Sequence, residues 1–302
     1  MSARETGALL ACGERVALDR PLLMGIVNAS PDSFSDGGLH ATLDARVQLA
    51  RELLADSADI LDVGGESATT GRPPVAVDEE IGLVVPLVER LAGELGALVS
   101  VDTYKPAVAR AAVAAGARVV NDVSGLRDPA LADVCAETGA ALVLMHTQAP
   151  PRTRLQDPEL YEDVTAEVVS FLEDRMELAL ERGVAREQLI LDPGPDFAKT
   201  PAQTIRLLGA IDRLRELGRP LLMAVSRKDF IGALTGRGPR ERGAGTLAAL
   251  AYGVEHGAHI FRLHDVRAAA DYLTVRAALD GKREPPGDLA LGEELRYARP
   301  RR

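Results

Sequence analysis

Tryptophan is absent from this 302-residue chain, and aromatic residues make up only 3% of it. Proteins that bind single-stranded nucleic acid without reading its sequence stack successive bases on aromatic side chains, so this scarcity argues against such a function. The hydrophobic content of 46% is still sufficient for a large core. That core must be packed mainly from Ala, Val, Leu and Ile.

Positive charge, cysteine and long apolar runs are scarce as well. The net charge of −10 repels polyanions, which argues against nucleic acid and anionic membranes as partners. Cys12 and Cys135, the two cysteines, provide no disulfide framework and suit a reducing compartment. No apolar run approaches the roughly 18 residues of a membrane span, and no signal peptide is recognisable. We therefore expect a cytoplasmic protein.

Short apolar runs recur along the chain instead. Eight are found, at residues 22–28, 59–64, 98–102, 118–122, 141–146, 189–192, 220–226 and 259–264. Segments of helical period separate them, with start signals such as Thr42, Pro106 and Thr200. Eight strands alternating with eight helical segments predict an α/β fold, a (β/α)8 TIM barrel. A doubly wound sheet is disfavoured because "NASPDSFSDGG", after the first run, is not the glycine-rich phosphate loop of that fold.

The barrel is predicted to form one domain over residues 1–281. Within it, residues 1–20 are expected to contribute a short β-hairpin that turns at Gly13 and closes the barrel floor. Residues 282–302 are charged and contain proline, so we interpret them as a partly disordered tail. We interpret "PPRTRLQ", residues 150–156, as a solvated loop.

The residues at the ends of the apolar runs carry the functional signal, because barrels of this kind place their sites at the carboxyl ends of the strands. The run ends are occupied by Asn28, residues 62–65, Asp102, Asn121 with Asp122, His146, Asp192, residues 226–228, Arg262 and His264. Strands generally exit into polar loops. A solvated rim nevertheless does not require this concentration of Asp, Asn, Lys, Arg and His, so we interpret this end as a catalytic face.

Carboxylate and amide groups form one chemical half of this face. Asp102, Asn121 and Asp192 can bind the donor and acceptor edge of a flat heterocycle through paired hydrogen bonds. The expected ligand of this half is therefore a nitrogen heterocycle.

Basic side chains form the other half. Lys228, Arg262 and His264, from the last two strands, predict a cationic corner for a phosphate or diphosphate. Asn28 and Asp36 are placed to face a metal ion on that diphosphate. Mg²⁺ suits this position because it takes few protein ligands and keeps several waters.

Nine segments resemble, in order and spacing, the signature segments of the dihydropteroate synthases. They are "NASPDSFSDGG", "DVGGES", "SVDTYKP", "GARVVNDVSGL", "LMHT", "LDPGPDFAKT", "SRKDFIG", "GTLAAL" and "FRLHDV". The resemblance extends from about residue 22 to residue 281.

The resemblance implies a transferase of folate biosynthesis that requires Mg²⁺. It would join 6-hydroxymethyl-7,8-dihydropterin diphosphate to 4-aminobenzoate, giving 7,8-dihydropteroate and diphosphate. The family is held to ionise the carbon–oxygen bond before the amine attacks, so its site mainly stabilises a departing anion and a pterin-methyl cation. Residues 30–38 would form a loop that closes over the reaction. Because homodimers through barrel helices are common, we also expect a homodimer.

The resemblance also assigns residue roles. The expected catalytic residues are Asp36, Lys228, Arg262 and His264. The residues expected to bind the pterin are Asp102, Asn121, Met145, Asp192, Phe197, Lys228 and Arg262. Asn28 is the expected metal ligand and, with Arg262 and His264, would hold the diphosphate.

The sequence departs from the family pattern around the second substrate. Thr69 occupies a position where the family has Arg, although Arg72 follows three residues later. Asp229 replaces a Ser of the 4-aminobenzoate carboxylate site, where like charge would oppose binding unless Arg227 offsets it. Asp196 stands where the family has Gly.

These departures leave alternative functions open. The chain is either a synthase with neutral changes in its loops, or a divergent paralogue that uses another amine or lacks synthase activity. A related pterin-binding barrel that transfers a methyl group is a further alternative. The cationic corner argues against methyl transfer, because that reaction needs no diphosphate site.

Overall fold

The computed structural model describes residues 9–29, 42–66, 74–292 and 295–296. Two of the expected site residues, Asp36 and Thr69, lie outside the described residues, as does the whole of the loop expected to close over the reaction.

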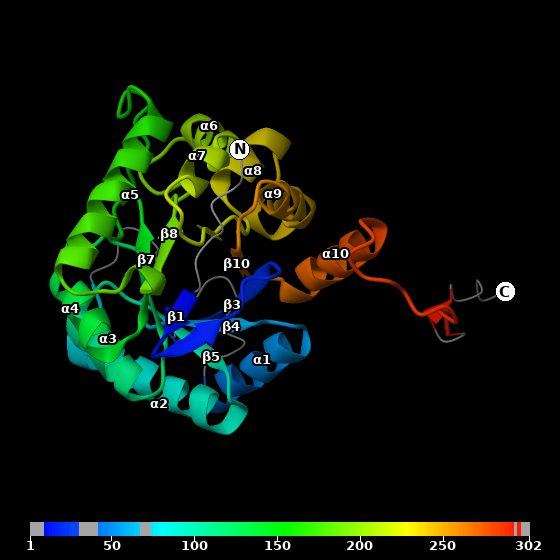
Figure 1. Ribbon diagram of the computed structural model, residues 1–302, viewed down its shortest axis with the longest axis horizontal. Helices are drawn as coiled ribbons and strands as arrows, with labels where there is room; N and C mark the ends of the chain where they lie inside the picture. Colours follow the sequence, from blue (N-terminus) through cyan, green and yellow to red (C-terminus); the bar gives the residue numbers. More distant parts are fainter. Residues whose placement is uncertain (1–8, 30–41, 67–73, 293–294, 297–302) are drawn as a thin grey trace.

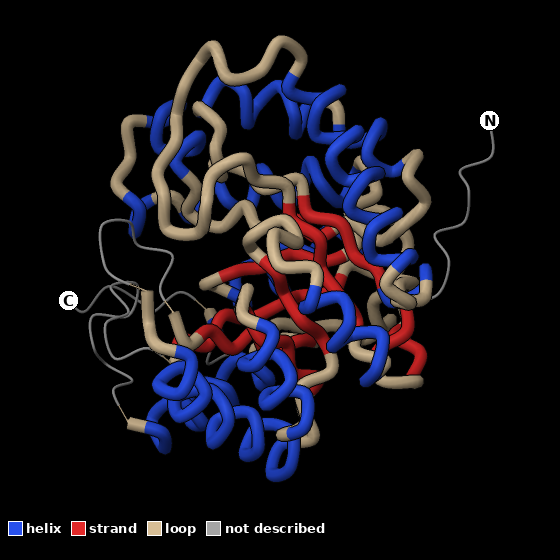
Figure 2. The backbone as a smooth tube through the Cα atoms, turned by 90° about the vertical axis from the view of Figure 1, so that its left-hand side faces the viewer, coloured by secondary structure: helices blue, strands red, loops and turns tan. Residues whose placement is uncertain are grey.

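Eight parallel strands form the central sheet, as the spacing of the apolar runs predicts (Figures 1 and 2). They are β3 (Leu22–Asn28), β4 (Ile60–Gly64), β5 (Leu98–Asp102), β6 (Val119–Asp122), β7 (Ala141–Met145), β8 (Leu189–Asp192), β9 (Leu222–Met223) and β10 (Ile260–Leu263). Their order is β8-β7-β6-β5-β4-β3-β10-β9. A parallel bridge between Leu191 and Leu221 joins the two ends of the sheet, which confirms the TIM barrel.

Helices surround the strands, as Figure 2 shows. They are α1 (Leu43–Ala55), α2 (Val77–Leu95), α3 (Pro106–Ala114), α4 (Ala130–Thr138), α5 (Val164–Glu181), α6 (Pro201–Gly209), α7 (Ile211–Arg215), α8 (Asp229–Thr235), α9 (Gly243–Glu255) and α10 (Val266–Leu279). The predicted start signals are confirmed, because Thr42 and Thr200 each accept a backbone N–H of the first turn of α1 and α6. No described helix is long and apolar enough to cross a membrane.

The predicted N-terminal hairpin is present and closes one end of the barrel. β1 (Leu9–Ala11) pairs antiparallel with β2 (Glu14–Val16), and Gly13 at the turn has a φ of 79°. Leu9 and Ala11 are buried among side chains that point into the barrel. The hairpin thereby seals the amino end of the strands from water.

Side chains along each barrel strand alternate between the interior and the helical layer. At the amino end the interior holds an apolar cluster, which we call the floor: Leu22, Met24, Ile60, Val119, Ala141, Val143, Ile190, Leu222, Ala224 and Ile260, with Leu9 and Ala11 of the hairpin. Two residues beyond Ile60, Val119, Ile190 and Ile260 stand Asp62, Asn121, Asp192 and Arg262. The same alternation that builds the floor therefore aims polar side chains into the opposite end.

Candidate active site

A cavity of about 680 Å³ opens at the carboxyl end of the strands. Its lining includes every expected site residue within the described part of the chain: Asn28, Asp102, Asn121, Met145, Asp192, Phe197, Lys228, Asp229, Arg262 and His264. The barrel thus brings together side chains from six strands, three loops and the first residue of α8. Their individual roles stay predictions.

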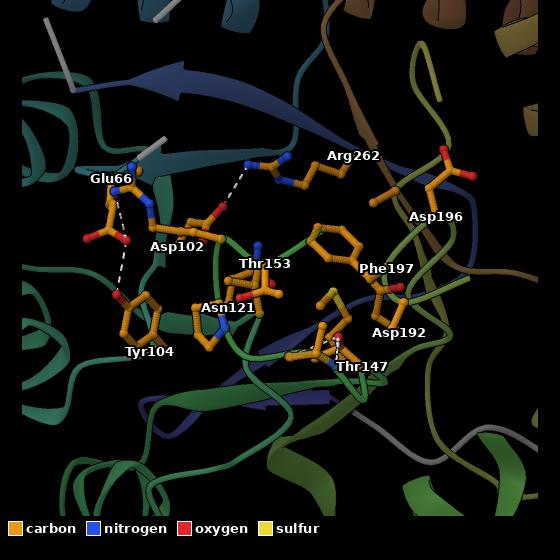
Figure 3. A pocket seen from close by; sticks show the side chains of 18 of the residues that line it. Glu66, Asp102, Tyr104, Asn121, Thr147, Thr153, Asp192, Asp196, Phe197 and Arg262 are labelled. Carbon is orange, nitrogen blue, oxygen red and sulfur yellow. Dashed lines mark hydrogen bonds and ion pairs between the residues drawn. The ribbon is translucent and has the colours of Figure 1, made fainter. Parts of the chain in front are cut away.

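Five polar side chains that face the barrel interior form a group that we call the polar ring: Asp62, Asp102, Asn121, Asp192 and Arg262. Arg262 Nη2 donates to Asp102 Oδ2 at 2.9 Å (Figure 3). Its Nε donates to Asp62 Oδ2 at 2.6 Å. Asn121 Nδ2 donates to the same Asp62 oxygen at 3.1 Å. Arg262 is therefore neutralised by two carboxylates. Asp62 was not among the expected site residues, although its place in the alternation marks it as interior.

Their surroundings raise the pKa of two carboxyls of the polar ring, Asp102 and Asp192. Burial raises the pKa of Asp192 to about 6, although the Gly194 N–H, which donates to its Oδ1 at 2.7 Å, and Lys228 both lower it. Burial also raises the pKa of Asp102 to about 7, against the lowering effect of Arg262. A heterocycle with neighbouring N–H groups would add donors to those that these carboxyls already have in Arg262 and the Gly194 N–H.

Lys228 and Phe197 form one wall of the cavity. Lys228 Nζ lies 4.3 Å from the centre of the Phe197 ring, a cation–π arrangement. Burial lowers the pKa of Lys228, opposed by the charges of Asp196 and Asp192. Figure 3 shows Phe197 beside Asp192 and Asp196 on one side of the cavity, with Glu66 and Tyr104 on the other side.

His264 does not contribute a positive charge, so the expected cationic corner needs correction. Burial and the charges of Arg227, Arg262 and Lys228 lower the pKa of His264 to about 3, which leaves the imidazole neutral at pH 7. Ser226 Oγ accepts the backbone N–H of His264 and lies 2.9 Å from its Nδ1. This arrangement favours the tautomer that keeps a proton on Nε2 as a neutral donor.

Lys199 fixes the loop that carries Phe197, a role that the sequence did not indicate. Its Nζ is fully buried, lies 2.8 Å from His146 Nδ1 and donates to the carbonyls of Gly194 and Phe197, both at 2.9 Å. Gly194 has a φ of 63°, and a Cβ there would lie 2.1 Å from the carbonyl oxygen of His146. Burial lowers the pKa of Lys199 to about 7.

Residues 150–156 form a partly exposed loop, as expected, and all seven also line the cavity, a role that the sequence did not indicate. Arg152 has a φ of 62°, in the left-handed region that bulky residues seldom adopt. Its Nη1 lies 3.3 Å from Glu66 Oε1, which also accepts the Tyr104 hydroxyl at 3.0 Å. Lys105 pairs with the other oxygen of Glu66 at 2.8 Å. The ion pair between Arg152 and Glu66 joins this loop to the segment after β4, and the loop sequence has no periodicity that predicts it.

The donor set at the end of β3 is compatible with a magnesium ion carried by a phosphate ligand. Asn28 lines the cavity there. No group of three or more His, Cys, Asp or Glu residues able to hold a metal occurs in the described part of the chain. One amide oxygen suits an ion that takes most of its ligands from phosphate and water.

Comparison with known proteins identifies relatives across nearly the whole chain. A family model described as pterin binding enzyme matches residues 24–264. A dihydropteroate synthase of Escherichia coli (strain K12) is 40% identical over 275 residues, which cover 91% of this chain and 97% of the relative.

Solved structures give the same result. A dihydropteroate synthase of Xanthomonas albilineans with 4-aminobenzoic acid is 44% identical, with a TM-score of 0.83 over 91% of this chain and 99% of that chain. A structure of the X. albilineans enzyme in complex with 7,8-dihydropteroate is 44% identical, with a TM-score of 0.81 over the same shares of the two chains.

Proposed function

The chain belongs to the dihydropteroate synthase family of pterin-binding enzymes, and we propose how its described residues carry out the family's reaction. The amine nitrogen of 4-aminobenzoate forms a bond to the methylene carbon of 6-hydroxymethyl-7,8-dihydropterin diphosphate. The bond from that carbon to the diphosphate oxygen breaks, and diphosphate and the amine proton leave. The observation that carries this proposal is that Asp102, Asn121, Asp192 and Arg262 of the polar ring line one cavity with Lys228 and Phe197.

The polar ring is proposed to hold the pterin. Asp102, Asn121 and Asp192 offer carboxylate and amide groups at the bottom of the cavity, where hydrogen bonds to the heterocycle are shielded from water. Arg262, held by Asp62 and Asp102, would lie against the ring. Phe197 would form a wall of the pterin pocket, and Met145, at the end of β7, would form its base.

The diphosphate is proposed to lie beside Asn28, Lys228 and His264. Lys228 supplies charge and neutral His264 supplies a hydrogen-bond donor, so that both stabilise the anion as it departs. A magnesium ion held partly by Asn28 would neutralise further charge on the diphosphate. Asp36, outside the described residues, remains an expected catalytic residue.

The carboxylate of 4-aminobenzoate is proposed to lie at the cavity edge formed by residues 227–229. Among the cations that line the described cavity, Arg262 pairs with Asp62 and Asp102, Arg152 lies near Glu66, and Arg154 donates to Gln156 Oε1. Arg227 and Lys228, on the segment between β9 and α8, are better placed to receive a second anion. Thr69 remains an expected substrate-binding residue.

The expected homodimer is proposed to form through α10, the helix set to one side of the barrel in Figure 1. Val275 and Leu279 on this helix are 59% and 80% exposed, and a second copy of the chain would cover them. We also propose that the protein is cytoplasmic, since Cys12 and Cys135 are both free thiols.

The proposed reaction is tested by incubating the protein with dihydropterin diphosphate, 4-aminobenzoate and Mg²⁺. Release of diphosphate and formation of dihydropteroate are measured together, with chelation of Mg²⁺ and the variant Asp192→Ala as controls. We expect equal amounts of both products, and loss of both in each control. Diphosphate release without dihydropteroate would indicate a paralogue that uses another amine. Transfer of a methyl group from methyltetrahydrofolate, without synthase activity, would overturn the proposal.

A further inference from the structure

Two charged side chains from different loops hold the peptide groups on either side of Lys228. Arg242 Nη1 donates to the carbonyl of Arg227 at 2.8 Å. Asp196 Oδ2 accepts the backbone N–H of Asp229 at 2.5 Å. Arg227 and Asp196 have φ values of 58° and 67°, so both stand in the left-handed region that favours glycine. The segment is therefore held in a strained backbone conformation by these contacts.

Arg242 also neutralises a carboxylate at the cavity edge. Its Nη1 lies 3.1 Å from Asp229 Oδ1, and its Nε donates to the carbonyl of Arg237 at 3.0 Å. The Arg242 side chain is 12% exposed although it does not line the cavity, whereas that of Asp229 is 53% exposed and does. Arg242 thus contacts a residue of the cavity edge without lining the cavity itself.

Glycine at position 232 makes this placement of Arg242 possible. A Cβ at Gly232 would lie 2.3 Å from Arg242 Nη2 and 2.5 Å from its Cζ. No real Cβ tolerates such distances, so any side chain at this position would displace the guanidinium from α8. The chain thereby leaves room for Arg242 directly beside the start of that helix.

From these contacts we propose that Arg242 is a positioning residue that makes the cavity edge accept an anionic amine, by neutralising Asp229 and fixing the segment around Lys228. This inference rests on the proposed function. Arg242 compensates the charge of Asp229, so the positive charge of Arg227 at the same cavity edge is left for the carboxylate of the substrate. Without Arg242, Asp229 is uncompensated beside Arg227 and repels the substrate.

A double-mutant cycle between Arg242 and Asp229 tests the proposal, with KM for each substrate and kcat measured separately. Arg242→Gln should raise KM for 4-aminobenzoate about fivefold, which corresponds to one exposed charge interaction of about 1 kcal/mol. Asp229→Asn alone should lower this KM about twofold. In the double variant the KM should return to within about twofold of that of Asp229→Asn, because no uncompensated carboxylate is left. The exposed Arg240 provides the matched control Arg240→Gln, which should leave both KM values unchanged.

The charge of the amine separates this role from a merely structural one. With uncharged 4-aminobenzamide as the amine, Arg242→Gln should change KM less than about twofold, since no anion is repelled. Gly232→Ala displaces Arg242 without removing its charge and should reproduce the higher KM for 4-aminobenzoate. If Arg242→Gln does not fold, two measurements still test the proposal. One is KM for 4-aminobenzoate in Gly232→Ala, and the other is the ratio of KM for 4-aminobenzoate to KM for 4-aminobenzamide in Asp229→Asn.

Two results would overturn the proposal. One is an unchanged KM for 4-aminobenzoate in folded Arg242→Gln. The other is an increase of equal size for the pterin and both amines that Asp229→Asn does not reverse, because that pattern belongs to general loosening of the loop. Failure of the proposed function is a different result, in which the unmodified protein forms no dihydropteroate at all.

Discussion

The two ends of the barrel interior are built on the same strands and do opposite things. At the amino end, the floor buries only apolar side chains and is sealed by the hairpin. At the carboxyl end, the polar ring buries carboxyls, an amide and an arginine around an open cavity. Ile190 and Asp192 stand two residues apart on β8 and face the same interior. Two residues along one strand thus separate a side chain that packs in the floor from a side chain that lines the cavity.

The two ends therefore contribute differently to stability: the floor stabilises the fold, and the polar ring opposes it. Floor residues contribute transfer free energy and close packing. The raised pKa values of Asp102 and Asp192 mean that burial opposes their ionised forms, and this opposition costs stability near neutral pH. We infer that the polar ring is retained for binding and that the floor compensates for it.

Arg262→Met should give the largest effect, because it leaves Asp62 and Asp102 buried without their counter-ion. Breaking a buried pair on one side typically costs about 3–5 kcal/mol. Loss of Arg262 should raise the pKa of Asp102 further above its unfolded value, so the stability contribution of this carboxyl is present at low pH and lost as pH rises. Denaturant unfolding should therefore show a smaller deficit at pH 5 than at pH 8. An equal loss of stability at pH 5 and pH 8 would contradict the ion pairing of Arg262 with Asp62 and Asp102.

Leu9→Ala should lower stability by about 2–5 kcal/mol, since Leu9 is 1% exposed within the floor. KM for the pterin substrate should stay unchanged in the folded variant, because the hairpin lies at the other end of the barrel. Weaker pterin binding by the folded variant would contradict the separation of stability and binding between the two ends of the barrel.

Asp102→Ala and Asp192→Ala should each weaken pterin binding more than tenfold. Each removes charge-assisted hydrogen bonds worth about 1.5–3 kcal/mol. Calorimetric titration with the pterin checks this, with circular dichroism as the control for folding. Unchanged affinity in both folded variants would show that the heterocycle binds elsewhere.

The sequence predicted most of the fold and the inward-facing part of the site because both depend on local periodicity. Eight apolar runs marked the strands, and Asn121 and Asp192 followed from their positions at run ends. Asp62 followed the same alternation, although it was not singled out.

Features set by long-range packing could not be predicted. Lys199 meets His146 only because two loops fold over each other. His264 loses its charge through burial, which no sequence pattern reports. Sequence reasoning considered Arg227 as the residue that offsets Asp229, whereas Arg242, thirteen positions away from Asp229, forms the ion pair.

The central claim, that the polar ring serves binding at the expense of stability, is tested most directly by Asp192→Asn. Burial raises the pKa of Asp192 to about 6 from its ordinary value of 3.8, so the wild-type protein loses stability as pH rises between these values. We predict that denaturant unfolding at pH 8 will show Asp192→Asn more stable than wild type by about 3 kcal/mol, with little difference near pH 4. The same protein should bind the pterin more than tenfold more weakly, while the matched floor variant Ile190→Val loses about 1 kcal/mol at every pH and keeps its affinity. If Asp192→Asn were less stable than wild type at pH 8, or bound the pterin as well as wild type does, the account would be contradicted.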